Sequence, residues 1–399
     1  MARRQTVSVK PELLLWARNT AGFTVEEAAR KIGVKPERLA SWEAGEAAPT
    51  ATQLRNAAYV YKRPLGAFFL PEAPDEPNPP HDFRRLYGEE PPPPSPSLLL
   101  ELRRARRRRS LALRLYGELD LDAQPFPLRA DIDSEPEAVA ERVRDWLRIP
   151  LEDQMRWRTA DEARDQWIAA LENRDVLVFQ TGRGVEAGEM RGFSLGERTL
   201  PVITLNSKDV RPAQVFTLLH ECVHLTLEEG GLCDPERVRS GGRTPDERVE
   251  VFCNRVAGAT LVPARALLDQ PEVAAVRRPV EWEEDTLREL TARFAVSREV
   301  LLRRLLILER TTEAFYQRKR EEYIAEYKAR AAEAELEEKR GFAPYYRLVV
   351  RNNGRRYTRL VLDALKREQI TPADVSDYLG VQLKHLENIA GAIAVDVEG

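Results

Sequence analysis

The sequence predicts a multidomain, mostly α-helical protein with a central α+β domain that contains a small sheet. The chain has 399 residues, which is more than one ordinary domain requires. A proline-dense stretch separates an N-terminal run of short helical segments from the rest of the chain. Short apolar segments with glycine-rich turns, which are typical of strands, are confined to the middle of the sequence.

The composition narrows the class of protein. With 43% hydrophobic and 32% charged residues, the chain suits a globular protein with true cores, and its formal net charge of −3 means that any nucleic-acid surface must be local. The sequence shows no signal peptide and no apolar segment that could span a bilayer. The cysteines are too few for a secreted disulfide framework. We therefore expect a cytoplasmic protein without a membrane partner.

Residues 1–70 form the first predicted domain, and their pattern favours a helix-turn-helix. Thr24 can cap a helix, Gly33 can make the tight turn after it, and Pro36 suits the first turn of the next helix. Three polar side chains near the start of that second helix are candidates for contact with the major groove of DNA. They are Lys35, Arg38 and Ser41.

The local charge of this domain agrees with double-stranded DNA as its partner. Residues 1–70 contain 11 Lys and Arg against 6 Asp and Glu, although the whole chain is slightly acidic. Two acidic residues, Glu37 and Glu43, nevertheless lie on the same predicted helix. A helix-turn-helix that binds a protein instead of DNA therefore stays open as an alternative.

Residues 71–97 read as an extended, proline-rich linker, since Pro91 to Pro94 can join neither a helix nor a central strand. An arginine-rich helical pattern follows from Leu98 to about Leu119. Its simplest interpretation is a solvated helix face, with a phosphate-binding face as the alternative.

Residues 98–310 form the predicted central domain, with its core at about 130–265. Apolar periodicity and turn residues divide this core into alternating helices and strands. The predicted elements are helices at Pro136–Leu147 and Ala160–Glu172, strands at Val176–Gln180, Met190–Leu195 and Leu200–Leu205, and helices at Pro212–Leu227 and Pro245–Ala259. A glycine-rich loop separates the last two helices.

The segment from His220 to His224 carries a candidate metal site. Positions four apart share one face of a helix, so both imidazoles can reach the same ion. Glu221 would then lie beside the metal, placed to take a proton from water instead of binding the ion. The alternative, a surface helix with two unrelated histidines, is disfavoured by the apolar flanks and by a total of four histidines in the chain.

A catalytic zinc site needs a third protein ligand and an open position. Glu250, on the following helix, is the best candidate, with Glu247 one turn earlier as its competitor. Asn254 lies one turn after Glu250 and can support it from behind. Cys222 is adjacent to the histidines but not on their face, and a small apolar role is the default for Cys253.

These motifs resemble the ImmA/IrrE family of metallopeptidases over roughly residues 130–310. The strings that carry the resemblance are Ile203-Thr-Leu-Asn206, Phe216-Thr-Leu-Leu-His-Glu-Cys-Val-His-Leu, and Glu250-x-x-Cys-Asn-x-Val-Ala with Leu261-Val-Pro263. The resemblance implies a zincin-like domain that binds Zn²⁺ through His220, His224 and Glu250, with Glu221 as the catalytic base. The sequence departs from the family at Cys253, where alanine is usual, and at Val256, where phenylalanine is usual. Both changes concern packing, not chemistry.

The segment from Thr24 to Gly45 is similar to the Xre/Cro family of DNA-binding domains, which precedes the peptidase domain in many ImmA/IrrE proteins. The combination implies a DNA-binding regulator whose zinc endopeptidase cleaves a specific protein, such as a transcriptional repressor. The alternative is a regulator or antitoxin whose peptidase fold binds a partner or senses metal without proteolysis; a toxin partner and a homodimer are further options. His81, in a segment that recurs in this architecture, is expected to be a docking residue and not a fourth ligand.

Residues 311–399 are predicted to form a long charged helix, Thr312–Arg340, and a small helical module. Thr371, Gly380 and Leu386 repeat the spacing of Thr24, Gly33 and Leu39. The C-terminal module is therefore expected to resemble a helix-turn-helix, and a packing or dimerisation role is as open as contact with DNA.

Overall fold

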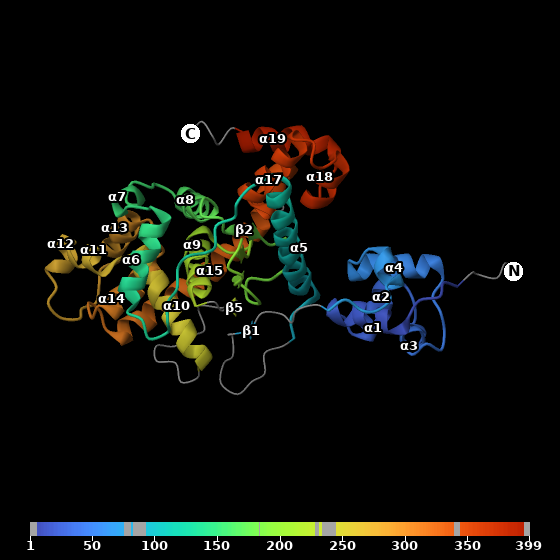
Figure 1. Ribbon diagram of the computed structural model, residues 1–399. Helices are drawn as coiled ribbons and strands as arrows, with labels where there is room; N and C mark the ends of the chain where they lie inside the picture. The colour runs from blue at the N-terminus through green and yellow to red at the C-terminus, as the bar shows by residue number, and fades with distance from the viewer. Residues whose placement is uncertain are drawn as a thin grey trace. The chain divides into compact units, whose positions relative to one another are not determined.

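The computed structural model describes residues 6–75, 81–82, 93–182, 184–227, 231–233, 245–338 and 344–394 (Figure 1). The chain divides into two compact units, Met1–Pro79 with Glu90–Arg104, and Pro80–Glu89 with Ala105–Gly399. Among the described residues, no helix combines the length and the apolar character needed to cross a bilayer.

The first unit is helical where it is described, and it contains the predicted helix-turn-helix. Thr24 caps α2 in a capping box with Glu27, Gly33 ends this helix with a φ of 83°, and Pro36 begins α3. Leu39 and Trp42 of α3 pack into the same apolar core as the other helices. The elements are α1 (Pro11–Thr20), α2 (Val25–Ile32), α3 (Pro36–Glu43), α4 (Ala51–Tyr61) and the 3-10 helix η1 (Leu65–Phe69).

The second unit is built around one sheet whose described strands follow the order β1-β5-β3-β4-β2. The pairs β2–β4 and β1–β5 are parallel, whereas β3 runs antiparallel to β4 and β5. The strands are β1 (His81–Asp82), β2 (Leu177–Gln180), β3 (Gly192–Leu195), β4 (Val202–Leu205) and β5 (Gly231–Cys233). The three strands predicted from the sequence are confirmed, each beginning one or two residues later than expected.

The strands β1 and β5 are a correction, because their residues were expected to lie in the linker and in the glycine-rich loop. Each has only two or three residues. So short a segment cannot show the alternation of apolar and polar side chains by which a strand is recognised. Pairing with a neighbouring strand defines these elements, and a single sequence does not reveal such pairing.

Helices cover both faces of the sheet. On one face, Val178, Ile203 and Leu205 share an apolar core with Leu218 and Leu219 of α9 (Arg211–Thr226), and α8 (Ala160–Glu172) contacts β2. On the other face, α16 (Tyr345–Asn353) and α17 (Arg355–Lys366) contact β2, and the ring of Phe179 meets that of Tyr357 edge-on at 5.9 Å. The C-terminal module therefore covers this face at β2, the strand at one end of the sheet.

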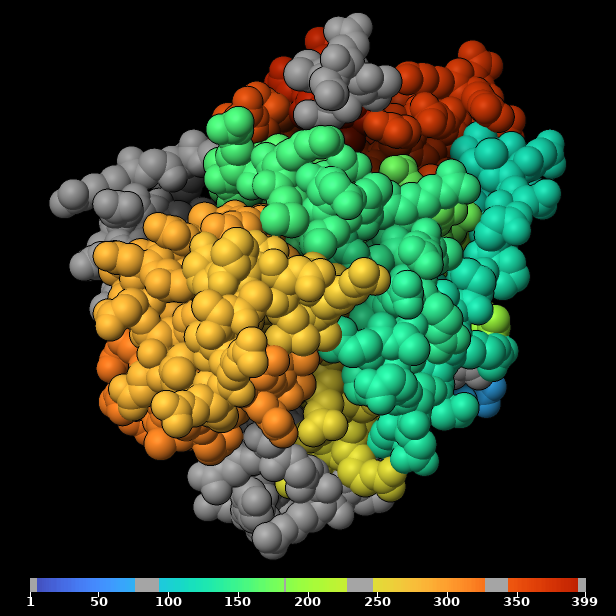
Figure 2. All heavy atoms as spheres, turned by 90° about the vertical axis from the view of Figure 1, so that its left-hand side faces the viewer, coloured from blue at the N-terminus to red at the C-terminus, as the bar shows by residue number. Residues whose placement is uncertain are grey.

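The remaining helices complete the second unit. Figure 2 shows one face of it, where the segment of α6 to α8 lies beside the segment of α11 to α14. Arg144 is buried between α6 and the end of α10, and its guanidinium donates to Gln154 Oε1, Thr260 O and Ile149 O at 2.6–2.8 Å. These helices are α6 (Pro136–Leu147), α7 (Leu151–Gln154), α10 (Pro245–Leu261), α11 (Ala264–Leu268), α12 (Pro271–Ala274), α13 (Glu284–Phe294), α14 (Arg298–Ile307), α15 (Glu313–Glu338), α18 (Pro372–Leu379), η3 (Leu383–His385) and α19 (Leu386–Ala394). The helix α5 (Pro96–Glu118) belongs to the first unit up to Arg104 and to the second unit from Ala105.

The arginine-rich face of α5 is more than a solvated surface. Arg109 donates to the backbone carbonyls of Thr199 and Leu200, and the guanidinium of Arg108 lies 5.1 Å from the centre of the Phe179 ring. Arg107 pairs with Asp377 of α18. These arginines hold α5 against the sheet and against the C-terminal module.

The predicted repeat in the C-terminal module is confirmed in its geometry. Thr371 caps α18 in a capping box with Asp374, and Gly380 ends that helix with a φ of 67°. Thr24, Glu27 and Gly33 do the same for α2. Side chains of α18 contact α5 of the same chain, which supports a packing role for this module.

Candidate metal centre

The helix α9 is buried along almost its whole length, from Gln214 to Thr226. Its start is fixed by the Gln214 amide, which donates to Asn206 O at 2.9 Å and to Asp209 O at 3.0 Å. Asn206 directly follows β4, so the sheet determines where α9 begins. The side chains of His220, Glu221 and His224 are fully buried on this helix.

Three potential ligand atoms meet at one point between α9 and α10. His220 Nε2 lies 3.1 Å from His224 Nε2 and 3.4 Å from Glu250 Oε2, and His224 Nε2 lies 3.2 Å from Glu250 Oε1. A tetrahedral zinc ion with bonds of about 2.0–2.1 Å holds its ligand atoms about 3.3 Å apart. The three side chains thus form a buried His-His-Glu group whose dimensions and donor set fit such an ion.

Asn254 orients one of the two imidazoles. It lies one turn after Glu250 on α10, and its Oδ1 is 3.1 Å from His220 Nδ1. A proton on Nδ1 that is donated to this oxygen leaves the lone pair of Nε2 directed at the His-His-Glu group. Asn254 therefore supports His220, whereas the sequence pattern predicted that it would support Glu250.

The remaining candidates lie apart from this group. Glu247 is half-buried and does not belong to it. Cys222 does not belong to it either, and burial raises the pKa of its thiol to about 12. Cys253 is fully buried in the apolar core. His81 pairs through its backbone with Gly231, and its side chain lies outside the described part of the structure.

The carboxylate of Glu250 is held in its charged form. Burial by itself would raise its pKa, but the neighbouring imidazoles of His220 and His224 outweigh burial and lower the pKa below its usual range. A cation requires an ionised carboxylate as its ligand, and this one is 1% exposed. The site therefore offers a buried negative charge beside two imidazole nitrogens.

Comparison with protein families agrees with this geometry. Residues 171–306 match the model of the IrrE N-terminal-like domain, peptidase family M78. Residues 171–306 are an IrrE N-terminal-like domain. Residues 14–68 match the model of a helix-turn-helix family. Neither the curated proteins nor the solved structures gave a significant match to the chain. The chain thus joins a helix-turn-helix of a DNA-binding type to a peptidase-family domain.

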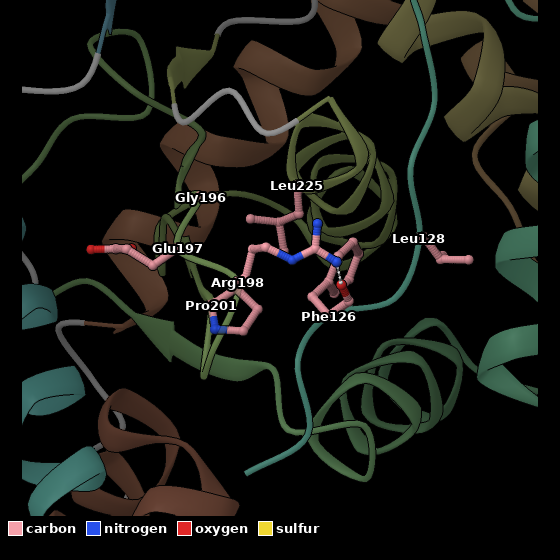
Figure 3. A pocket seen from close by; sticks show the side chains of 7 residues that line it. All are labelled: Phe126, Leu128, Gly196, Glu197, Arg198, Pro201 and Leu225. Atoms are coloured by element: carbon pink, nitrogen blue, oxygen red, sulfur yellow. Dashed lines mark hydrogen bonds between the residues drawn. The ribbon is translucent and has the colours of Figure 1, made fainter.

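The IrrE N-terminal-like domain begins within α8 and ends within α14, so that α9 and α10 lie wholly inside it. One small cavity also lies largely in this domain, and Figure 3 shows it from close by. Leu225 lines it, and Arg198 donates to the Phe126 carbonyl at 2.9 Å beside it. None of its lining residues belongs to the His-His-Glu group, and its volume suits about one water molecule. We assign it no part in the candidate site.

Of the three side chains predicted to contact DNA, two are exposed on the helix-turn-helix domain. Lys35 and Arg38 are exposed at the start of α3. Ser41 is half-buried, and its hydroxyl donates to the carbonyl of Arg38. Glu43 turns inward and accepts hydrogen bonds from Arg18 at 2.8, 2.9 and 3.1 Å, so its charge is neutralised within the domain. One of the two acidic residues that weakened the DNA interpretation is thereby accounted for.

Two residues of the site, Gly192 and Thr217, were not predicted from the sequence. A Cβ at Gly192 would meet Thr217 and Glu221. Thr217 precedes Glu221 by four residues, a spacing that places two side chains on one helix face. A glycine inside a strand often marks a close approach of another group. These signals existed in the sequence, but neither identifies the neighbour that makes the approach.

Proposed function

We propose that the IrrE N-terminal-like domain is a zinc-dependent endopeptidase that cleaves a specific protein, such as a transcriptional repressor, and that the helix-turn-helix domain binds operator DNA. The observation that supports it most is the meeting of His220, His224 and Glu250 at the spacing of a tetrahedral ion. The two family matches support the combination of peptidase and DNA-binding domains.

The proposed chemistry assigns a separate task to each residue. His220, His224 and Glu250 are the ligands of an ion that, when bound, supplies positive charge to polarise a carbonyl and to acidify water. Glu221 accepts a proton from the attacking water and passes it to the leaving amine. Asn254 keeps His220 in the tautomer that a ligand requires.

The burial of the ligands and of Glu221 supports the same proposal. The ligands and Glu221 are surrounded by apolar residues of α9 and α10, such as Val223 and Val256. Electrostatic interactions are stronger in such surroundings than in water. A structural zinc site would have four protein ligands, and the group found in the described residues supplies three, as catalytic zinc sites do.

The test compares cells of the source organism that express either the wild-type protein or Glu221→Gln at equal levels. The readout is the set of new protein N-termini, measured by mass spectrometry. We expect a small set that appears with the wild-type protein only, because the variant keeps the ligands and loses the base. Occupancy of DNA, measured by chromatin immunoprecipitation, is the control and is expected to be the same.

An identical set of N-termini in both strains, together with unchanged repression, would refute the peptidase proposal. It would favour the second function class, a regulator whose peptidase fold binds a partner or senses metal without proteolysis.

A further inference from the structure

Gly192, the first residue of β3, lies directly against α9. A Cβ atom at this position would stand 2.5 Å from Thr217 Cγ2, and 3.2 Å from both Cγ and Oε1 of Glu221. The first distance is shorter than protein side chains tolerate. Since Gly192 is not among the glycines with positive φ, the reason for glycine here is space and not backbone conformation.

The two side chains that meet Gly192 belong to one face of α9. Thr217 and Glu221 are one turn apart, and both are buried, with exposed fractions of 1% and 0%. The methyl group of Thr217 occupies the space that a Cβ of residue 192 would need. The Thr217 methyl and the Glu221 side chain therefore both pack around the place that a Cβ at position 192 would take.

This contact limits where the carboxylate of Glu221 can lie. A glutamate side chain has three rotatable bonds, and burial alone does not select one position for its oxygens. The size of residue 192 limits it on one side, because a Cβ at this position would stand 3.2 Å from both Cγ and Oε1 of Glu221. A catalytic group must be held to within about 0.5 Å to be effective, so such a boundary has consequences for chemistry.

We propose that Gly192 is a positioning residue for Glu221: its bare Cα admits the Thr217 methyl and thereby keeps the Glu221 carboxylate directed at the metal site. The inference rests on the proposed function, since it takes Glu221 as the base. A larger residue at position 192 pushes Thr217 and Glu221 away from β3, which misplaces the carboxylate without removing any ligand.

The test uses the full-length protein reconstituted with cobalt(II), whose visible absorption reports ligand binding, and acetohydroxamate as the probe. The hydroxamate binds the metal through its oxygens and can donate a hydrogen bond to a carboxylate beside the metal. Glu221→Ala removes the acceptor of that bond and is expected to weaken binding about tenfold or more. Gly192→Ala is expected to weaken it to the same degree while retaining its full cobalt content.

A suppressor variant and a matched control separate positioning from folding. Adding Thr217→Ser to Gly192→Ala removes the methyl that makes the 2.5 Å contact, and we expect it to restore most of the hydroxamate affinity. Gly188→Ala is the control, since a Cβ at Gly188 meets nothing within 4 Å, and it should match the wild type. Thermal unfolding of the metal-free variants measures the steric cost independently of the probe.

Wild-type affinity in Gly192→Ala would overturn the inference. So would a double variant that folds, binds cobalt and stays as weak as the single variant, or a Gly192→Ala that loses cobalt and stability with no recovery by Thr217→Ser. Failure of the proposed function is distinguishable, since it is read separately, from the protein N-termini of cells with the wild-type protein and with Glu221→Gln. A wild-type protein that takes up no cobalt would overturn the metal site and the inference with it.

Discussion

Glu172 gives this protein a predictable dependence of stability on pH. The side chain lies at the end of α8 beside the C-terminal module, is 5% exposed, and accepts a hydrogen bond from the backbone N–H of Arg356 at 3.2 Å. A Cβ on Gly354 would stand 2.8 Å from its Oε1, so the carboxyl is closely covered. Burial raises the pKa of Glu172 from 4.5 to about 7, against the opposing effect of the nearby arginines.

The sign and size of the effect follow from the difference in protonation. Between pH 4.5 and about 7 the folded protein keeps a proton that the unfolded chain has lost, so the free energy of unfolding falls as the pH rises. The full stability is present below pH 4.5 and is lost progressively up to the folded pKa. A shift of about 2.5 pKa units, from 4.5 to about 7, corresponds to about 3 kcal/mol.

Glu172→Gln removes this titration and keeps an oxygen that accepts from the N–H of Arg356. We expect the variant to be more stable than the wild type by up to about 3 kcal/mol at pH 8 and by less than about 1 kcal/mol at pH 5. The assay is urea unfolding of the metal-free, full-length protein, followed by tryptophan fluorescence, to which Trp167 of α8 contributes. Glu141→Gln, at an exposed position of α6, is the control. A difference between variant and wild type that is the same at both pH values would refute the reasoning.

Three further predictions concern other parts of the chain. Asn254→Ala should weaken zinc affinity about 10- to 100-fold, measured by competition with a chromophoric chelator, whereas Asn254→Asp, which keeps an acceptor for His220, should not. Arg144→Ala should lower the free energy of unfolding by about 2–4 kcal/mol in urea titrations. The reason is that the Gln154 side chain and two buried backbone carbonyls lose their donor. Unchanged stability would contradict this prediction. The double variant Lys35→Ala, Arg38→Ala should weaken binding to operator DNA. The slope of log K against log salt concentration should fall by about one for each phosphate that the variant no longer neutralises. An unchanged slope would exclude phosphate binding by these residues.

Much of the fold followed from local patterns in the sequence. The helices at 136–147 and 160–172 have the predicted bounds, since periodicity, a proline at the start of one and Thr159 as the cap of the other agree with the tertiary structure. The turn at Gly33 was predictable for the same reason, because a left-handed residue after a capped helix favours glycine. The spacing of His220 and His224 implied a shared face, and the structure brings Glu250 to them.

The features that were not predicted depend on contacts between segments that are far apart in the sequence. The sequence places Glu43 on the predicted DNA-binding helix. In the structure Glu43 pairs instead with Arg18 of another helix. Asn254 was expected to support its own helix neighbour, but it reaches His220 on α9. The strand β5 exists because β3 offers it a partner. In each case the deciding residue lies far away in the sequence, and a single sequence gives no indication of the pairing.

The most direct test of the central claim is the metal content of the wild-type protein and of His224→Ala, measured by elemental mass spectrometry. His385→Ala is the control, because His385 lies in the C-terminal module, where its ring is tilted against that of Tyr345 with 4.9 Å between the ring centres. We expect close to one zinc per chain in the wild type and in the control, and its loss in His224→Ala. No zinc in the wild type after reconstitution, or full zinc in His224→Ala, would contradict the proposed metal centre.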